Sequence, residues 1–269
     1  METLIVVPAR YGSTRLPGKP LAEIAGRSMV SRVAELARRA AAALGRADCV
    51  VATDDMRILE HCRDKGINVV MTDARLPSGS DRALAAAEGL GVNPDFIVNL
   101  QGDAPFTPVA HVVAVVNALR TTGADAATPY IRLSWKALDQ LRAHKRETPF
   151  SGTTLVADPK GRALWFSKTI LPAIRKEEAL RALGPLSPVC QHIGLYGFRL
   201  EALKRYCALP ESHYERLEGL EQLRLIENGM RVQAVEVEPG PIAIPGIDTA
   251  EDIALAERLV AELGEPDRV

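Results

Sequence analysis

Residues 4–20, LIVVPARYGSTRLPGKP, join an apolar run to a loop that is rich in glycine and positive charge. The run at 4–7 is typical of a buried β-strand. The loop that follows carries two glycines and three cations: Gly12, Gly18, Arg10, Arg15 and Lys19. In a parallel α/β sheet, ligands bind outside the carboxyl ends of the strands. Glycine lets backbone N–H groups approach an anion and the cations neutralise it, so the stretch predicts an α/β fold with a phosphate-binding loop.

This loop does not fit the Walker A pattern of P-loop NTPases. Gly12 and Gly18 are separated by five residues instead of four, and Pro20 stands where a Ser or Thr would hold magnesium. A basic surface loop without a ligand is the alternative interpretation. The position of the loop directly after a buried strand favours the anion site.

Strands and helices alternate through the first half of the chain. Strands are predicted at 4–7, 49–53, 67–71 and 96–100. Helices are predicted at 29–44, 55–65, 81–90 and 108–121. This alternation implies right-handed crossovers and a mostly parallel, Rossmann-like sheet with helices on both faces.

The second half is less regular. Extended runs are predicted on both sides of a D-P-K-G turn signal and once more further along, at 153–157, 163–166 and 194–198. A charged amphipathic helix is predicted at 214–228, and a last helix at 249–263 opens with an N-cap and an acidic first turn, T-A-E-D. We therefore expect a single α/β domain, 1–269, in which the segment at about 130–210 adds an antiparallel layer.

Composition excludes several function classes. The 269 residues are 47% hydrophobic and 25% charged with a net charge of −1, so no global field favours nucleic acid or a membrane surface. We find no run of about 18 apolar residues and therefore expect no membrane insertion. The four cysteines show no metal-like spacing and are expected to be reduced thiols in a cytoplasmic protein.

Two carboxylates stand where a divalent cation could bind. Asp103 lies in NLQGDAP at 99–105, straight after a predicted strand, and Asp248 lies in PGIDTAEDI at 245–253, just before the last helix. Magnesium held by one or two carboxylates neutralises phosphate charge. Asp248 also has a structural alternative, because it or the next residue could cap the helix.

The second strand ends in ATDD at 52–55, and SGSDR at 78–82 opens a helix. Ser78 fits an N-cap with Asp81 at the third helical position, which would be a purely structural role. A ligand role for these segments rests on the resemblance that follows.

The segment VVPARYGSTRLPGKPL at 6–21 closely resembles the opening signature of the 3-deoxy-manno-octulosonate (Kdo) cytidylyltransferases. QGDAP, GIDTAEDI and SGSDR resemble the family's QGDEP, GVDTPEDL and S-G-T-[ED]-R motifs. The resemblance extends to about residue 258 and includes the segments RALWFSKTILP, QHIGLYGFR and LEGLEQLR. It implies a fold of the nucleotide-diphospho-sugar transferase type, a homodimer and Mg²⁺ as the cofactor.

The resemblance also implies roles for individual residues. Those expected to act in catalysis are Arg10, Lys19, Asp103 and Asp248, of which Asp103 and Asp248 bind the metal. Those expected to bind the nucleotide are Ala9, Arg10, Gly12, Ser13, Arg15, Lys19, Ala52, Thr53, Asp54, Ser78, Gly79, Arg82 and Gln101. Those expected to bind the sugar are Gln101, Lys168, His192, Tyr196, Glu221 and Gln222.

Each sugar candidate has a structural alternative. His192 could be a satisfied core histidine, Tyr196 a packing residue, and Glu221 and Gln222 part of a solvated helix face. The chain also departs from the family at three positions. Ala104 replaces a glutamate, Lys168 an arginine and Thr154 a lysine. Lysine lacks the bidentate geometry that arginine offers to a carboxylate.

The implied reaction couples CTP to the acidic sugar Kdo, giving CMP-Kdo and pyrophosphate, with lipopolysaccharide or capsule synthesis as the expected pathway. An alternative is the same chemistry on another ulosonic acid, an amino-Kdo or a sialic-type acid. A glycosyltransferase is a second alternative, but no D-x-D metal motif stands at the strand ends. The third is a non-catalytic nucleotide-binding regulator of the same fold.

Overall fold

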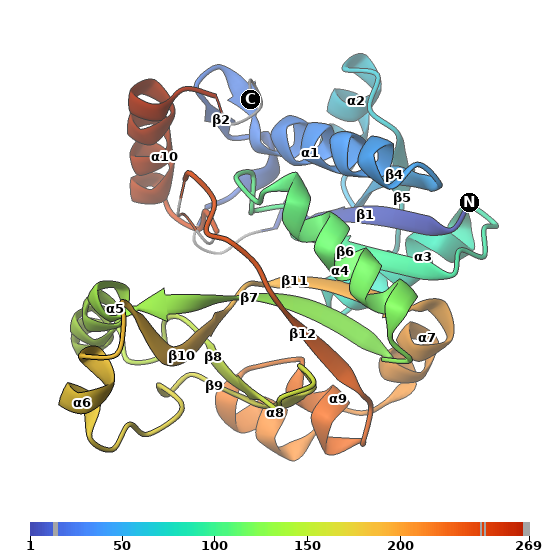
Figure 1. Cartoon of the computed structure of the whole chain (residues 1–269). Coiled ribbons are helices and arrows are strands. Elements are labelled where there is room, and N and C mark those ends of the chain that lie inside the picture. Colours follow the sequence, from blue (N-terminus) through green and yellow to red (C-terminus); the bar gives the residue numbers. More distant parts are fainter. Residues whose placement is uncertain (13–15, 243, 245, 266–269) are drawn as a thin grey trace.

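The computed structural model describes residues 1–12, 16–242, 244 and 246–265. Its strands in the large sheet are β1 (Thr3–Ala9), β4 (Ala47–Thr53), β5 (Val69–Met71), β6 (Phe96–Leu100), β7 (Ala126–Ser134), β8 (Thr154–Ala157), β9 (Ala163–Ser167), β10 (Leu186–His192), β11 (Leu195–Arg199) and β12 (Val232–Glu236). These form a ten-stranded sheet in the order β5-β4-β1-β6-β11-β7-β10-β8-β9, with β12 paired to β7 (Figure 1). A separate hairpin consists of β2 (Glu23–Ile24) and β3 (Arg27–Ser28).

β1 is the centre of the parallel half of the sheet. It is parallel to both β4 and β6, and β5 extends the same edge beyond β4. Its side chains alternate between the two faces: Leu4 and Val6 join one core cluster, and Ile5 and Val7 join the other. A strand of this kind is apolar throughout because helices cover both faces.

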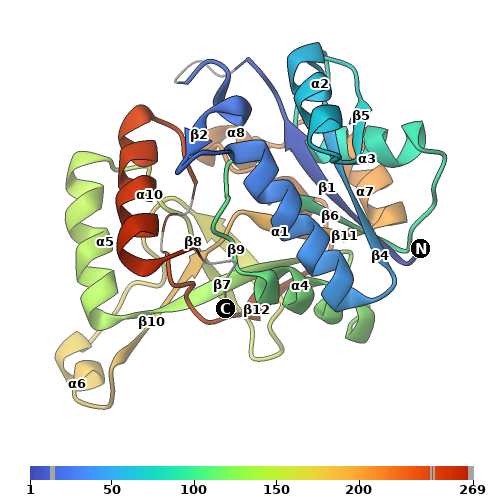
Figure 2. The same cartoon turned by 90° about the horizontal axis from the view of Figure 1, so that it is seen from above.

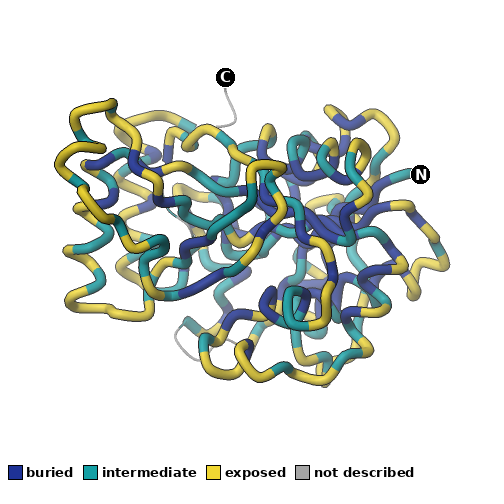
Figure 3. Tube along the Cα trace, turned by 60° about the horizontal axis from the view of Figure 1, so that its bottom comes forward, coloured by how far each residue is buried: buried dark blue, intermediate teal, exposed yellow. Residues whose placement is uncertain are grey.

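Helices lie on both faces of this half (Figure 2). The Ile5 face packs against α1 (Met29–Leu44), α2 (Met56–Asp64) and α4 (Val109–Thr121). The Leu4 face packs against α3 (Gly79–Gly89) and α7 (Leu200–Ala208). The burial colouring in Figure 3 shows the same layering, with buried backbone in the interior and exposed backbone in the outer turns.

Antiparallel strands continue the sheet beyond β6. β11 is antiparallel to β6 and to β7, and β10 links β7 to the β8–β9 hairpin. Two further helices, α5 (Trp135–Glu147) and α6 (Glu177–Arg181), lie toward the outer end of β7 and β10 (Figure 1). The α/β class, with a parallel sheet flanked by helices and an antiparallel addition, is confirmed.

The predicted helix at 214–228 is wrong. The structure has two short helices there, α8 (His213–Glu218) and α9 (Leu223–Glu227). Gly219 ends the first one with φ of 60°, a left-handed conformation that glycine adopts without strain. The Arg224 guanidinium then bonds the Glu215 carboxylate at 2.5 and 2.8 Å, which folds the second helix back on the first.

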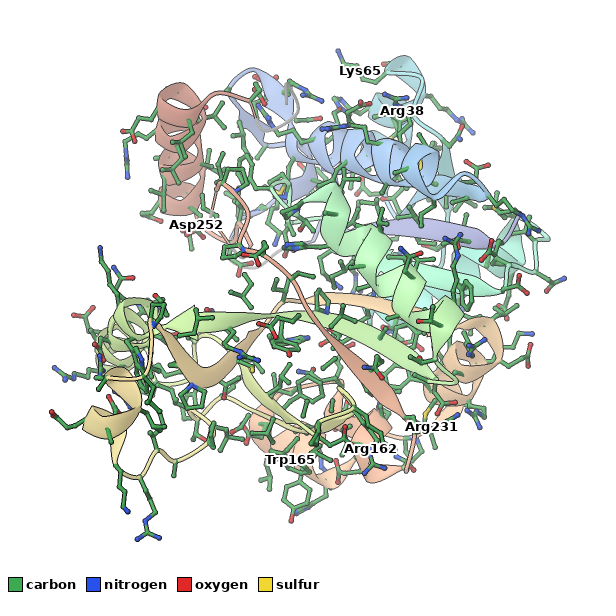
Figure 4. All side chains as sticks on the ribbon, viewed as in Figure 1. Arg38, Lys65, Arg162, Trp165, Arg231 and Asp252 are labelled. Carbon is green, nitrogen blue, oxygen red and sulfur yellow. The ribbon has the colours of Figure 1, made fainter. Side chains whose placement is uncertain are left out.

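The C-terminal helix α10 (Ala250–Leu263) packs against the β2–β3 region and not against the main sheet. Thr249 caps it, and Asp252 completes a capping box (Asp252 is labelled in Figure 4). The helix thereby holds residues 246–249 next to the loop after β6, where the Ile247 N–H donates to the Asp103 carbonyl at 2.9 Å. Within the described residues, no helix combines the length and apolar character needed to cross a membrane.

Gly197 in β11 lies against α4, and the packing there leaves no room for a side chain. A Cβ would stand 2.6 Å from Val115 Cγ1 and 3.0 Å from Leu119 Cδ1. We expect Gly197→Ala to lower the free energy of unfolding by about 1–3 kcal/mol, measured by urea denaturation, because overpacking strains a close-packed core. Gly184→Ala is the matched control, since nothing lies within 4 Å of its Cβ position. Equal stability of the two variants would contradict this packing.

Candidate active site

The glycine-rich loop leaves the carboxyl end of β1 and turns back at Gly18. The Gly18 N–H donates to the Tyr11 carbonyl at 3.1 Å, and its φ of 73° is readily adopted by glycine. The Tyr11 ring lies under the Arg57 guanidinium at 3.3 Å, and Asp55 holds that guanidinium in turn. Ser13 and Arg15, both predicted to bind nucleotide, lie outside the described residues, whereas Gly12 stands in the described part of the loop.

Lys19 connects this loop to both predicted metal ligands. It begins the short 3-10 helix η1 (Lys19–Leu21), and its ammonium donates to Asp103 Oδ2 at 2.7 Å and to Asp248 Oδ1 at 3.1 Å. Burial on its own would lower the pKa of Lys19, but charge attraction and hydrogen bonds from the two carboxylates outweigh it. The pKa of Lys19 is therefore raised, and the side chain carries its positive charge.

The helix-capping alternative is confirmed for Thr249, which is the N-cap, and not for the Asp248 side chain. The Asp248 backbone N–H donates to Asp252 Oδ2 at 2.9 Å. The Asp248 carboxylate turns toward Lys19 instead. Across the described ranges, no group of three or more His, Cys, Asp or Glu side chains is arranged to hold a metal ion. A metal here would have two protein carboxylates and would take its other ligands from phosphate and water, as magnesium commonly does.

Gly102 brings Asp103 close to β1. A Cβ on Gly102 would overlap the Pro8 carbonyl oxygen, so the loop after β6 reaches its position only because residue 102 lacks a side chain. This contact sets how closely the loop after β1 approaches Asp103, which together with Asp248 forms the acidic pair of the site.

Behind the loop, one carboxylate holds two arginines. Asp54 lies 3.5 Å from Arg10 Nε and 2.8 Å from Arg82 Nη2. Arg82 is 0% exposed and also donates to Thr72 Oγ1 at 2.5 Å. Arg10 is exposed and donates to the Ala74 carbonyl. The structure therefore presents Arg10 to solvent at the mouth of the site and places Arg82 beneath it as support.

The other predicted nucleotide residues line the same edge of the sheet. Ala52 and Thr53 are buried at the end of β4. Ser78 caps α3, accepting the Asp81 N–H at 3.2 Å and donating to its carboxylate at 2.5 Å, so it has the structural role that the sequence left open. Gly79 approaches Asn99 so closely that a Cβ would lie 3.2 Å from its Nδ2 atom.

A cavity of about 460 Å³ opens beside the acidic pair. It brings together seven residues that the sequence had singled out: Gly79, Gln101, Asp103, Tyr196, Glu221, Gln222 and Asp248. Burial raises the pKa of the Glu221 carboxyl, and burial also raises the pKa of Tyr196. Glu221 and Gln222 are not on a helix face, because they lie in the break between α8 and α9.

Sequence reasoning missed Asn99, which also lines the cavity. Its Nδ2 donates to Ser80 Oγ at 3.3 Å, and its Oδ1 accepts from Gln101 Nε2 at 3.3 Å. The chain of bonds connects the start of α3 to the side chain of Gln101. The available signal was a polar, 2% exposed residue inside the otherwise apolar strand β6, directly before the QGD motif.

His192 and Lys168 lie outside the lining of this cavity. His192 packs between Phe166 and Tyr196 with ring centroids at 5.2 and 5.4 Å, and it bonds Thr128 Oγ1 at 2.8 Å. Burial lowers its pKa to about 3, so its imidazole is neutral. The residue is half-buried, and its role in sugar binding stays a prediction. The Lys168 ammonium lies close to Gly219, a residue that lines the cavity. A Cβ at position 219 would stand 3.3 Å from the lysine Nζ atom.

The backbone of Lys168 is held from two sides. Its N–H donates to Glu218 at 2.8 Å, and its carbonyl accepts from Lys145 Nζ at 2.6 Å. Thr154 is buried nearby, donating to the Thr169 carbonyl and accepting the Leu171 N–H. The threonine therefore has a structural role in joining β8 to the segment after β9.

A cationic loop that faces paired carboxylates across the carboxyl edge of an α/β sheet is the arrangement of a nucleotidyltransferase. Residues 4–232 match the family model described as Cytidylyltransferase. The chain belongs to this family and, within it, to the 3-deoxy-manno-octulosonate cytidylyltransferases.

Relatives of that name cover nearly the whole chain. The one from Maricaulis maris is 40% identical over 98% of this chain and 99% of its own length. The one from Xanthomonas oryzae pv. oryzae is 41% identical over 97% of this chain and 96% of its own. The solved structure of CMP:2-keto-3-deoxy-manno-octonic acid synthetase complexed with CTP superposes with a TM-score of 0.83 at 32% identity, covering 98% of this chain and 100% of that one.

The Gly102 contact makes a prediction for activity. In Gly102→Ala the new methyl group must push the loop away from the Pro8 carbonyl, which moves Asp103. We expect pyrophosphate release to fall at least about 100-fold, because displacing a reacting group by about 1 Å has that effect. Gly184→Ala, whose Cβ position is open, should retain full activity. Activity of Gly102→Ala within threefold of the parent would show that the close approach is unimportant.

Proposed function

We propose that this protein transfers CMP from CTP to Kdo, releasing pyrophosphate, with Mg²⁺ as cofactor. The observation that carries the proposal is the meeting of Lys19 with Asp103 and Asp248, the two carboxylates that line the 460 Å³ cavity. Relatives named for this activity cover the chain at about 40% identity, and a solved CMP-Kdo synthetase complexed with CTP has the same fold.

The residues at the carboxyl edge suit a nucleoside triphosphate. Arg10 and Lys19 supply positive charge on the two sides of the loop. Asp103 and Asp248 are already drawn together about a single cation and have the oxygen ligands that magnesium prefers. When bound there, Mg²⁺ would neutralise charge on the phosphates.

The cavity suits a polyhydroxylated acid. Gln101, Tyr196 and Glu221 offer hydrogen-bonding groups to its hydroxyls, and the Lys168 ammonium at its rim offers a cation for its carboxylate. The anomeric hydroxyl oxygen attacks the α-phosphorus in line with the departing pyrophosphate oxygen, forming one P–O bond as the other breaks, and the hydroxyl proton passes to water. Arg10 and Lys19 stabilise the charge that develops on the phosphates.

Two further expectations accompany this reaction. The four cysteines are free thiols, which fits the reducing cytoplasm, where we propose that the reaction takes place. A homodimer through the segment at about 130–210 stays a prediction from the family resemblance. Leu183 and Leu186 give this segment exposed apolar surface, at 83% and 51% exposure.

The direct test is pyrophosphate release with CTP, Mg²⁺ and a panel of acids that includes Kdo, an amino-Kdo and a sialic acid. We expect release with Kdo, and loss of at least about 1,000-fold in Asp103→Asn, because a ligand to the charge-neutralising metal is removed. Asp95→Asn, whose carboxylate lies at the opposite end of β6, is the control. Release with another acid but not with Kdo would identify that acid as the acceptor. No release with any acid would refute the proposal.

Lys168 is expected to act on the sugar and not on the nucleotide. Lys168→Met should raise the KM for the acid sugar about 10-fold, the loss of one charged hydrogen bond, and leave the KM for CTP unchanged. Lys168→Arg should have a KM for the sugar equal to or below that of the unmodified protein, since arginine can bind a carboxylate with two hydrogen bonds. Lys160→Met, which removes an exposed lysine from the turn before β9, is the control. A rise in the KM for CTP instead would contradict the assignment.

A further inference from the structure

The contact between Lys19 and the acidic pair joins three distant parts of the chain. The lysine comes from the segment after β1, Asp103 from the loop after β6, and Asp248 from the turn before α10. The bonded residues are 84 and 229 positions apart in sequence. The bond from the Ile247 N–H to the Asp103 carbonyl already joins the two acidic segments, so the ammonium lies between two carboxylates that the fold has brought together.

Burial distinguishes the three groups. The Lys19 side chain is 15% exposed, whereas those of Asp103 and Asp248 are 34% and 38% exposed. The ammonium is therefore the inner member of the cluster, and the carboxylates keep their outer sides toward the cavity that both of them line. Among the described side chains of this cluster, one ammonium lies between two carboxylates.

We propose that Lys19 occupies the place of the divalent cation between Asp103 and Asp248 until CTP binds, and that the triphosphate then draws the ammonium away as the metal enters. The inference rests on the proposed function, because it takes CTP and a divalent cation as the ligands. It assigns Lys19 a second role besides phosphate binding: it suppresses metal binding at the empty site and couples metal binding to nucleotide binding.

The charges explain why an exchange is favourable. Two carboxylates this close repel each other, and the lysine between them relieves that repulsion. A triphosphate brings several negative charges to the same place. One ammonium cannot neutralise both the phosphates and the two carboxylates, so a divalent cation must enter to balance their charge. Lysine suits this exchange because its charge is compact and its four-carbon stem is flexible.

Linkage makes the exchange measurable. If the ammonium competes with the metal, removing it raises the metal affinity of the nucleotide-free protein. In the unmodified protein, any factor by which CTP raises metal affinity must equal the factor by which the metal raises CTP affinity. The proposal can therefore be tested with metal alone, without turnover and without a sugar.

The experiment is a titration of the full-length, nucleotide-free protein with Mn²⁺, with free Mn²⁺ followed by electron paramagnetic resonance. We expect Lys19→Met to bind Mn²⁺ at least about 10-fold more tightly than the unmodified protein, which is within the usual range of coupling between sites. Lys19→Arg keeps a cation and should bind as weakly as the unmodified protein. Lys65→Met should change nothing, because Lys65 is an exposed lysine at the end of α2 (Figure 4). Adding Asp103→Asn to Lys19→Met should abolish the gain.

A second readout protects the test against a variant that folds poorly. The two carboxylates in Lys19→Met lack their shared cation, so its Tm should fall without metal and rise with Mn²⁺ by more than that of the unmodified protein. Lys19→Gln, which is neutral but polar, should give the same pattern if the methionine variant does not fold. Mn²⁺ affinity in the neutral variants equal to or below that of the unmodified protein would overturn the inference. That failure is distinct from failure of the proposed function, which is decided by pyrophosphate release from the unmodified protein.

Discussion

The parallel pairing of β1 with β4 on one side and β6 on the other is the constraint on which the rest of the site depends. Its register sets Thr3 opposite both Ala47 and Phe96, so all three strands run in the same direction and their carboxyl ends meet at one edge. Both faces of β1 are covered by apolar helices, and a slip of one residue would exchange the two sets of buried side chains. The loop cations and Asp103 are therefore brought together by the same burial that stabilises the fold.

Small residues then bring the segments closer than ordinary side chains would permit. Gly102 lies against the Pro8 carbonyl, and Gly79 lies against Asn99. Through Asn99, the start of α3 on the nucleotide side is bonded to Gln101 on the cavity side. The two halves of the site are thus part of one rigid framework, which suits a reaction that requires two substrates in line.

Buried charge supports this framework from beneath the loop. Arg82 and Asp54 form a pair beneath the loop, and the Asp54 carboxylate also holds Arg10 at the mouth of the site. Removing one member of such a pair leaves an uncompensated charge, so these residues are constrained as strongly as those that contact substrate. A functional motif can therefore contain residues whose contribution is mainly structural.

Much of this protein was determined by its sequence alone. The apolar run of β1 and the glycines and cations after it predicted the α/β class and the edge of the sheet that holds the site. The resemblance of several motifs to the Kdo cytidylyltransferases implied the reaction family. Only the tertiary structure decided which contacts the individual residues make. His192 packs between two aromatic rings, Thr154 joins β8 to the segment after β9, the helix expected at 214–228 is broken at Gly219, and Lys19 bridges both aspartates. Local periodicity reports which face of an element is buried, but the partners of Lys19 are 84 and 229 residues away, and only the folded chain brings their charges together.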